Sequence, residues 1–158
     1  SRSEAVQQGP VYLDVAGGNG DAGQNTPWLR RKIYLMKYVA VFHANLNYAY
    51  LVPERYEYVI RSSYELLIDT MRERFPDTQY VFEASGYTLE QIAEKTPDVL
   101  EKLQAAIASG CCEFMGSPYA HPMLPNFPEE DGLWTIEFSN DVYRRLLGFR
   151  PRSFWNPE

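Results

Sequence analysis

Polar residues stand at or just past the ends of short apolar segments, where they could bind or act on a ligand. In parallel α/β folds, the loops at the carboxyl ends of the strands converge on one face and build the active site there. Imidazole, carboxylate and amide groups at these positions suit proton transfer, nucleophilic attack or hydrogen bonding to a polar substrate. Both histidines of the chain are among them. The residues are His43 and Asn45, Glu83 and Ser85, Ser117 and His121, and Asn156 and Glu158.

Each candidate residue also has a structural explanation. His43 could be a hydrogen-bonded core histidine, and Glu83 and Glu113 could be acids in structural salt bridges. His121 lies in a proline-rich loop, where a purely structural role would suffice. Glu158 is the last residue and would ordinarily be treated as frayed. Residue types and positions alone leave these alternatives open.

The elements that would position these side chains alternate regularly along the chain. Short apolar runs of the kind found here suit buried parallel strands. Strands that alternate with helices form a parallel sheet with right-handed crossovers, so the predicted fold class is α/β. The expected strands are residues 38–42, 79–83, 112–115 and 153–155.

The expected helices have recognisable ends. The first helical pattern begins near Pro53, which suits a first turn, and stops before Pro76. Its apolar stripe consists of Ile60, Tyr64, Leu67 and Met71. A Thr-x-x-Gln capping box predicts that a short helix begins at residue 88. Two further helices, each ending at a glycine, are expected over residues 96–110 and 129–148.

Composition narrows the function classes. The chain has 158 residues, 45% of them hydrophobic, and can bury a core. Its net charge of −6, with scattered Lys and Arg, is unlike that of a nucleic-acid-binding protein. No apolar run reaches the roughly 20 residues that span a bilayer, and the first residues lack the order of a signal peptide. We therefore expect no nucleic-acid partner and no membrane partner.

The two cysteines indicate a reducing compartment. Cys111 and Cys112 are adjacent, so they cannot join distant segments of the chain by a disulfide. This usage predicts a cytoplasmic protein. The cysteines and histidines also lack the spacing of a zinc site, and we expect neither a metal nor a cofactor.

Two segments resemble motifs of glycoside hydrolase family 57. Residues 110–125 read GCCEFMGSPYAHPMLP and are similar to the family's pattern of glycine, glutamate and then Tyr-x-His-Pro-x-Leu-Pro. Residues 147–158 read LGFRPRSFWNPE and are similar to its Gly-x-x-Pro-x-x-x-Trp-x-x-Glu segment, which carries the nucleophile. The resemblance extends from about Val39 to the last residue, and one helix separates the two motifs, as in the family.

The resemblance implies a fold, a reaction and a set of residues. The family folds as an incomplete (β/α)7 barrel and acts mostly on α-glucans, so residues 37–158 would be the N-terminal part of such a catalytic barrel, preceded by an irregular segment over residues 1–36. The reaction would be hydrolysis or glucanosyl transfer by double displacement. Glu158 would be the nucleophile. The implied substrate-binding residues are His43, Asn45, Glu83, Glu113, His121 and Trp155.

The sequence departs from the family pattern at one position and ends before a second catalytic group. The family's first motif usually reads His-x-His-Gln-Pro, whereas this chain has Asn45 where the second histidine belongs; an amide binds a hydroxyl but carries no charge. A retaining glycosidase also needs an acid/base carboxyl group, which in the family is an aspartate on a later strand. The absent initial Met and the Asn-Pro-Glu end also lead us to expect that native sequence is missing.

Two other functions remain open from the sequence. A metal-dependent polysaccharide deacetylase has a related barrel but needs an Asp and two His ligands in close motifs that this chain lacks. A non-catalytic carbohydrate-binding or interaction module could keep the barrel without a full active site. Four strands of a barrel would also leave an open edge and an exposed apolar face, which predicts either a homo-oligomer or cover by a missing C-terminal part of the same protein.

Overall fold

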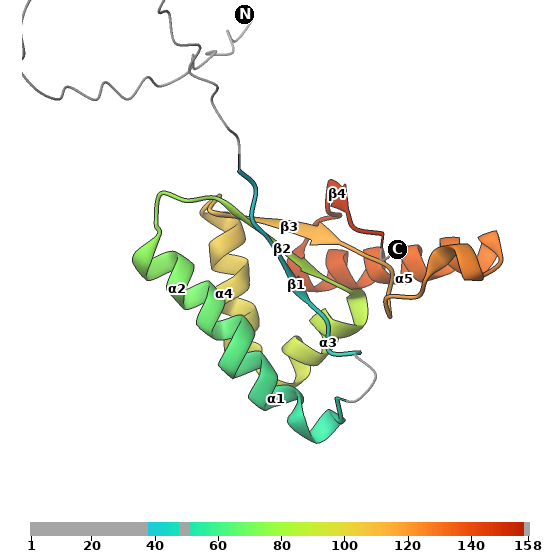
Figure 1. Ribbon diagram of the computed structural model, residues 1–158, viewed down its shortest axis with the longest axis horizontal. Helices are drawn as coiled ribbons and strands as arrows, with labels where there is room; N and C mark the ends of the chain where they lie inside the picture. Colours follow the sequence, from blue (N-terminus) through green and yellow to red (C-terminus); the bar gives the residue numbers. More distant parts are fainter. Residues whose placement is uncertain (1–37, 48–50, 157–158) are drawn as a thin grey trace, which may run out of the picture. The chain divides into compact units, whose positions relative to one another are not determined.

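The computed structural model describes residues 38–47 and 51–156, whose four short strands are all parallel (Figure 1). The strands follow one another across the sheet in chain order. Each crossover thus moves one place in the same direction, as in a (β/α) barrel and unlike a doubly wound sheet. This confirms the predicted α/β class and partial barrel. The strands are β1 (Val41–Ala44), β2 (Tyr80–Ala84), β3 (Cys112–Gly116) and β4 (Ser153–Phe154).

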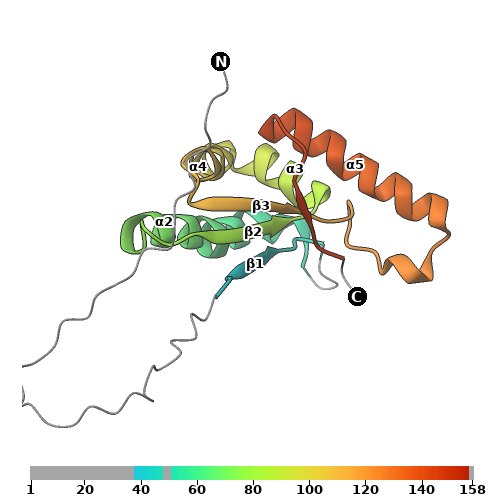
Figure 2. The same ribbon diagram turned by 90° about the horizontal axis from the view of Figure 1, so that it is seen from above.

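The helices gather on one face of the sheet (Figure 2). Between β1 and β2 the chain forms four consecutive helical segments, which are η1 (Pro53–Arg55), α1 (Tyr56–Val59), η2 (Ile60–Glu65) and α2 (Leu66–Arg74). The other crossovers contain α3 (Gly86–Lys95) and α4 (Pro97–Ala108), then η3 (Leu124–Asn126) and α5 (Glu129–Leu147). Among the described residues, no helix has the length and apolar character needed to cross a membrane. The irregular segment expected over residues 1–36 lies outside the described residues.

The π-helical segment η2 changes which side chains of the first crossover face the core. Ile60, Tyr64 and Met71 are buried as predicted, but Ile68 is buried in place of Leu67, which is only partly covered. A π-helical turn contains more residues than an α-helical turn, so the inward face shifts by about one position. The apolar stripe predicted from a period of 3.6 residues per turn was therefore wrong at one position, where Ile68 is buried and Leu67 is only partly buried.

The helix after β2 begins earlier than the capping box predicted. Ser85 is the N-cap of α3, and its side chain accepts a hydrogen bond from the backbone N–H of Thr88 at 3.2 Å. The adjacent Gly86 allows α3 to approach α5 closely, because a Cβ atom there would lie 2.9 Å from the Cα of Ser139. The helix over residues 129–147 was predicted correctly and ends at Gly148, whose φ of 82° suits a left-handed cap.

The sheet face opposite the helices carries both polar and apolar side chains. Side chains alternate along each strand, and Phe82 and Phe114 point into the helix-covered core. The other face alternates between polar and apolar side chains, which by strand register are His43, Glu83 and Glu113 and Val41, Val81 and Met115. This face corresponds to the inner side of the barrel. Strands β1 and β4 are the edges of the described sheet, and the homo-oligomer stays a prediction.

Tyr143 of α5 joins two strand ends through its hydroxyl group. The buried phenol donates to the carbonyl oxygen of Ala84 at 2.7 Å and accepts from the backbone N–H of Ser117 at 3.0 Å. Its ring also packs against Phe114, with centroids 5.2 Å apart. The ends of β2 and β3 are therefore held at a fixed separation by one side chain.

Replacing Tyr143 with Phe should destabilise the protein, because the change leaves a buried carbonyl group and a buried N–H group without their partner. We expect the free energy of unfolding to fall by about 1–3 kcal/mol, measured by urea denaturation of the natural protein. Tyr80→Phe is the matched control, since the buried Tyr80 hydroxyl has no hydrogen-bond partner among the described residues. Equal losses for the two variants would contradict the bridging role of Tyr143.

Candidate active site

A buried carboxylate at the end of β2 holds two histidines from the neighbouring strand ends. Glu83 is fully buried, and its two oxygens take different partners. Its Oε2 lies 2.9 Å from Nδ1 of His43, at the end of β1. Its Oε1 lies 2.9 Å from Nε2 of His121, in the loop after β3. Three positions predicted from the sequence thus meet at the carboxyl edge of the sheet.

The carboxylate also fixes which imidazole nitrogens remain available for other partners. A carboxylate only accepts, so His43 donates through Nδ1 and His121 through Nε2. The remaining nitrogens, Nε2 of His43 and Nδ1 of His121, can accept from a hydroxyl group when neutral or donate to one when protonated. The His43 side chain is 41% exposed and that of His121 is 11% exposed, so His43 is the more accessible to a ligand.

The environment of Glu83 keeps its carboxyl group ionised. Burial raises the pKa of Glu83, but hydrogen bonds from His121, Ser117 and His43 together outweigh that effect, and the pKa lies below its ordinary value. A general acid needs the opposite shift, because it must hold a proton near neutral pH. Glu83 therefore suits the role of an anchor for the imidazoles and not that of a proton donor.

The loop after β3 carries His121 in a strained conformation. The φ angle of His121 is 51°, in the left-handed region that few residues other than glycine adopt. Ser117 supports the ring, with its Oγ 2.8 Å from Nε2 of His121. The sequence indicates Ser117 only as a polar residue at a strand end, and nothing in it points to Tyr143, which holds the Ser117 backbone.

Asn45 shapes the loop after β1. Its Oδ1 accepts from the backbone N–H of Asn47 at 2.9 Å. The Asn47 side chain in turn donates to the carbonyl oxygen of Ala120 at 3.1 Å, next to His121. The loops after β1 and β3 are thereby connected through two asparagines. Asn45 lies near the site by this connection, and its contact with substrate stays a prediction.

Trp155 closes the site from the side of β4. Its ring lies against that of His43, with centroids 4.5 Å apart and planes inclined by 56°. The backbone N–H of Trp155 donates to the carbonyl oxygen of Gly116 at 2.8 Å and fixes its position beside β3. The indole is partly exposed and can offer its apolar surface to a ligand. Glu158, the predicted nucleophile, follows three residues later and lies outside the described residues.

Glu113 does not join the cluster. It pairs in register with Val81, whereas Glu83 pairs with Met115, so Glu113 lies two residues closer to the amino ends of the strands. Its Oε1 accepts from Ser153 Oγ at 2.8 Å. A contact between Glu113 and substrate stays a prediction.

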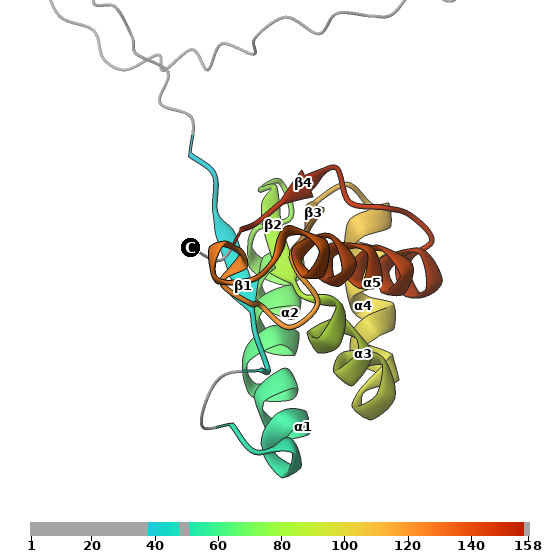
Figure 3. The same cartoon turned by 90° about the vertical axis from the view of Figure 1, so that its right-hand side faces the viewer.

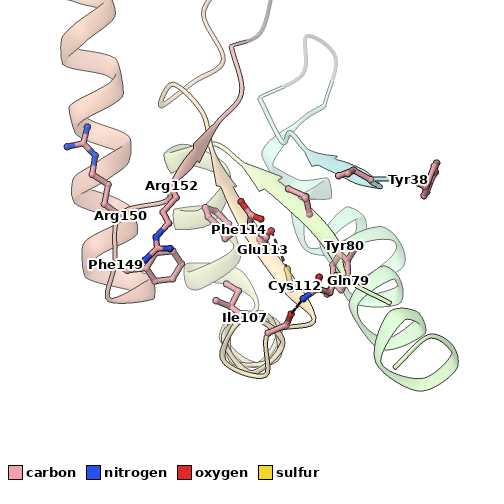
Figure 4. Close-up of a pocket in the computed structure, with 13 residues that line it drawn as sticks. Tyr38, Gln79, Tyr80, Ile107, Cys112, Glu113, Phe114, Phe149, Arg150 and Arg152 are labelled. Carbon is pink, nitrogen blue, oxygen red and sulfur yellow. Dashed lines mark hydrogen bonds between the residues drawn. The ribbon is translucent and has the colours of Figure 1, made fainter. Parts of the chain in front are cut away.

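A separate hollow lies at the opposite, amino edge of the sheet (Figure 4). Its volume is about 860 Å³, and its lining includes Glu113, Phe149 and Arg152. It contains neither histidine, and parallel α/β proteins bind their substrates at the other edge. We therefore place the candidate active site at the Glu83 cluster.

Comparison with known proteins identifies the family. The sequence model of Glycosyl hydrolase family 57 matches residues 10–158. The chain belongs to glycosyl hydrolase family 57. This confirms the resemblance predicted from the two motifs. Among similar proteins, the 4-alpha-glucanotransferase of Thermococcus litoralis is 33% identical over 112 residues, and the alpha-amylase of Pyrococcus horikoshii is 26% identical over 112 residues.

The family 57 chain spans about a sixth of the length of these curated relatives. The two alignments cover 71% of this chain but 16% and 17% of the respective relatives. Among solved structures, the T. litoralis 4-alpha-glucanotransferase superposes with a TM-score of 0.63 at 28% identity, over 76% of this chain and 18% of that one. A branching enzyme from Thermococcus kodakaraensis gives a TM-score of 0.60 over 75% of this chain and 32% of that one. Its 15% identity shows a shared fold alone.

Among residues 38–47 and 51–156, no group of His, Cys, Asp and Glu side chains is arranged to hold a metal ion. Nδ1 of His43 and Nε2 of His121 both contact Glu83, so these two nitrogens are committed to the carboxylate. The cluster of this family 57 chain is therefore a hydrogen-bonded anchor in its present geometry.

Replacing Glu83 with Gln should destabilise the protein in a pH-dependent way. The folded-state pKa of Glu83 is lowered, so its contribution to stability is present above the ordinary Glu pKa of about 4.3 and is lost as pH falls through the folded-state pKa. We expect the difference in unfolding free energy between wild type and variant to be largest near pH 7 and to narrow below pH about 4. Urea denaturation across this pH range measures it.

Glu101→Gln on the exposed side of α4 provides the matched control, because it removes a carboxylate in solvent. It should change stability little at either pH. A Glu83 variant whose effect is independent of pH would contradict the ionised anchor.

Proposed function

We propose that this chain supplies the first strands of the catalytic barrel of a retaining enzyme that acts on α-glucan. The reaction is hydrolysis or glucanosyl transfer by double displacement. The observation that carries the proposal is the His43–Glu83–His121 cluster with Trp155 beside it, at the carboxyl edge of a parallel sheet. Membership of family 57 and the relatives named alpha-amylase and 4-alpha-glucanotransferase support the substrate class.

In this proposal, the described residues bind the sugar and Glu158 attacks it. The free nitrogens of His43 and His121 hydrogen-bond hydroxyl groups of the ring that contains the anomeric carbon, and Trp155 covers its apolar face. Glu158 follows Trp155 closely in the chain, which favours its arrival at the same ring. The acid/base carboxyl group that completes a retaining mechanism belongs, by the family pattern, to a strand after β4.

The alternative is a carbohydrate-binding module without turnover. It is favoured by Asn45, which stands where the family pattern has a second histidine and whose side-chain oxygen is engaged by Asn47. The two proposed functions can be distinguished by product formation, because a binding module would bind glucan but form no product, whereas the enzyme would form product. We also propose a cytoplasmic location, on the argument that adjacent cysteines do not form a structural disulfide.

Glu158→Ala in the natural full-length protein should lower turnover of maltooligosaccharides by about a thousand-fold or more. Azide should restore turnover of an activated α-maltosyl fluoride, because it can enter the space that the carboxylate leaves. The product should be the β-configured glycosyl azide, since azide attacks from the side of the missing nucleophile. Product analysis by NMR measures both the rescue and the configuration.

Glu101→Gln should keep wild-type turnover. An active Glu158→Ala variant would remove Glu158 from the role of nucleophile. A wild-type protein that binds maltooligosaccharides without any product would instead establish the binding module.

A further inference from the structure

A second group of aromatic rings lies on α5 and on the loop before it, outside the candidate active site. Trp134 and Phe138 stand one turn apart on α5, with ring centroids 6.0 Å apart and planes inclined by 31°. Tyr119 contacts Phe138 at a centroid distance of 6.4 Å. Trp134 is 63% exposed and Phe138 is 55% exposed. We call these three rings the aromatic platform. Exposed aromatic side chains that gather in this way mark a binding surface.

A hollow of about 380 Å³ lies beside the platform. The rings of Tyr119 and Phe138 line it together with Val142, and charged groups complete the lining. Its volume is of the order needed for one or two sugar rings, at the lower end of the range for ligand sites. The hollow therefore combines apolar walls with polar groups at its rim, as small-molecule sites do.

The polar groups around the hollow are held in place and balanced in charge. Glu90 accepts from the Tyr119 hydroxyl at 2.6 Å and also pairs with Arg145. Asp141 accepts from Arg144 at 2.6 Å. Each of the two carboxylates that line the hollow is paired with one arginine, of which only Arg145 itself lines the hollow, so neither a polyanion nor a polycation gains from the local field. A neutral ligand that both donates and accepts hydrogen bonds fits better.

We propose that the aromatic platform and its hollow form a second glucan-binding site that takes one or two glucosyl units of a polymeric α-glucan. A pyranose ring presents apolar C–H groups to an aromatic face, and its hydroxyl groups donate and accept at the rim. The choice of glucan as the ligand rests on the proposed function. Contact with another protein is the rival use of this surface and is an outcome of the test.

The platform is connected to the active site through one loop. Tyr119 precedes His121 by two residues, and its backbone N–H donates to the Thr135 carbonyl oxygen at 3.1 Å. The Tyr119 carbonyl oxygen accepts from the N–H of Tyr87 at 3.0 Å, at the start of α3. A glucan chain held by the platform is therefore bound on the same rigid elements that carry His121. The platform should therefore strengthen the binding of long glucan chains and have no effect on short substrates.

The test uses the full-length protein with Trp134→Ala and Phe138→Ala combined. Affinity electrophoresis in gels containing glycogen should show about tenfold or greater weakening of glycogen binding, because buried aromatic contacts dominate binding energy. The KM for glycogen should rise to a similar extent. The kcat/KM for a short chromogenic maltoside should stay at the wild-type value.

Two further variants keep the test decisive. Tyr58→Ala removes a ring that is 69% exposed on α1 and should leave glycogen binding unchanged. Asp141→Arg fills the hollow from an exposed position and should weaken glycogen binding even if the double alanine variant does not fold. The proposal would be overturned if the double alanine variant folds and both it and Asp141→Arg bind glycogen as tightly as the wild type. Dissociation of a complex, with glycogen binding intact, would also overturn it and assign the platform to a protein partner.

The outcome does not depend on catalysis. If the wild type fails to turn over any α-glucan, the proposed function fails, whereas glycogen retention still reports on the platform by itself.

Discussion

The structure depends on a charged carboxylate that is taken out of water and held there by hydrogen bonds. Burial of Glu83 alone would disfavour its ionised form, and only the donors from His121, Ser117 and His43 reverse that cost. These donors come from the ends of β1 and β3, on either side of β2. The charge therefore stays stable only while all three strand ends keep their relative positions.

Several contacts maintain those positions, and each acts on a different part of the site. The Tyr143 hydroxyl sets the separation of the ends of β2 and β3 from the helix side of the sheet. Asn47 connects the loop after β1 to the carbonyl group of Ala120, beside the strained His121. Trp155 packs on His43 from the side of β4. The imidazoles are thus prepared for a ligand before it binds, which reduces the entropy lost on binding.

Local sequence signals predicted the elements well and the contacts between them less well. The glycine after α5 and the proline before it bound a periodic pattern, so residues 129–147 could be predicted without tertiary information. The π-helical turn in η2 could not, because a 3.6-residue period has no means of showing an extra residue. Ser85 is the observed N-cap of α3, but the sequence favoured Thr88, because Thr88 and Gln91 also fit the pattern of a capping box.

The candidate site shows the same division. His43, Glu83 and His121 could be named because strand ends in parallel sheets converge, but the carboxylate that joins both imidazoles depends on register and loop geometry. Glu113 was named by family resemblance and lies two residues away along the strand, bound to Ser153. Tyr143 gave no signal, because a tyrosine in an amphipathic helix is ordinarily a packing residue.

The most direct test of the account is a crystal structure of the full-length Glu158→Gln variant with a bound maltooligosaccharide. We predict a glucosyl ring at the carboxyl edge of the sheet, with its hydroxyl groups within hydrogen-bond distance of His43 Nε2 and His121 Nδ1 and one face against Trp155. A sugar bound only in the hollow at the amino edge, with the Glu83 cluster empty, would contradict the assignment of the active site.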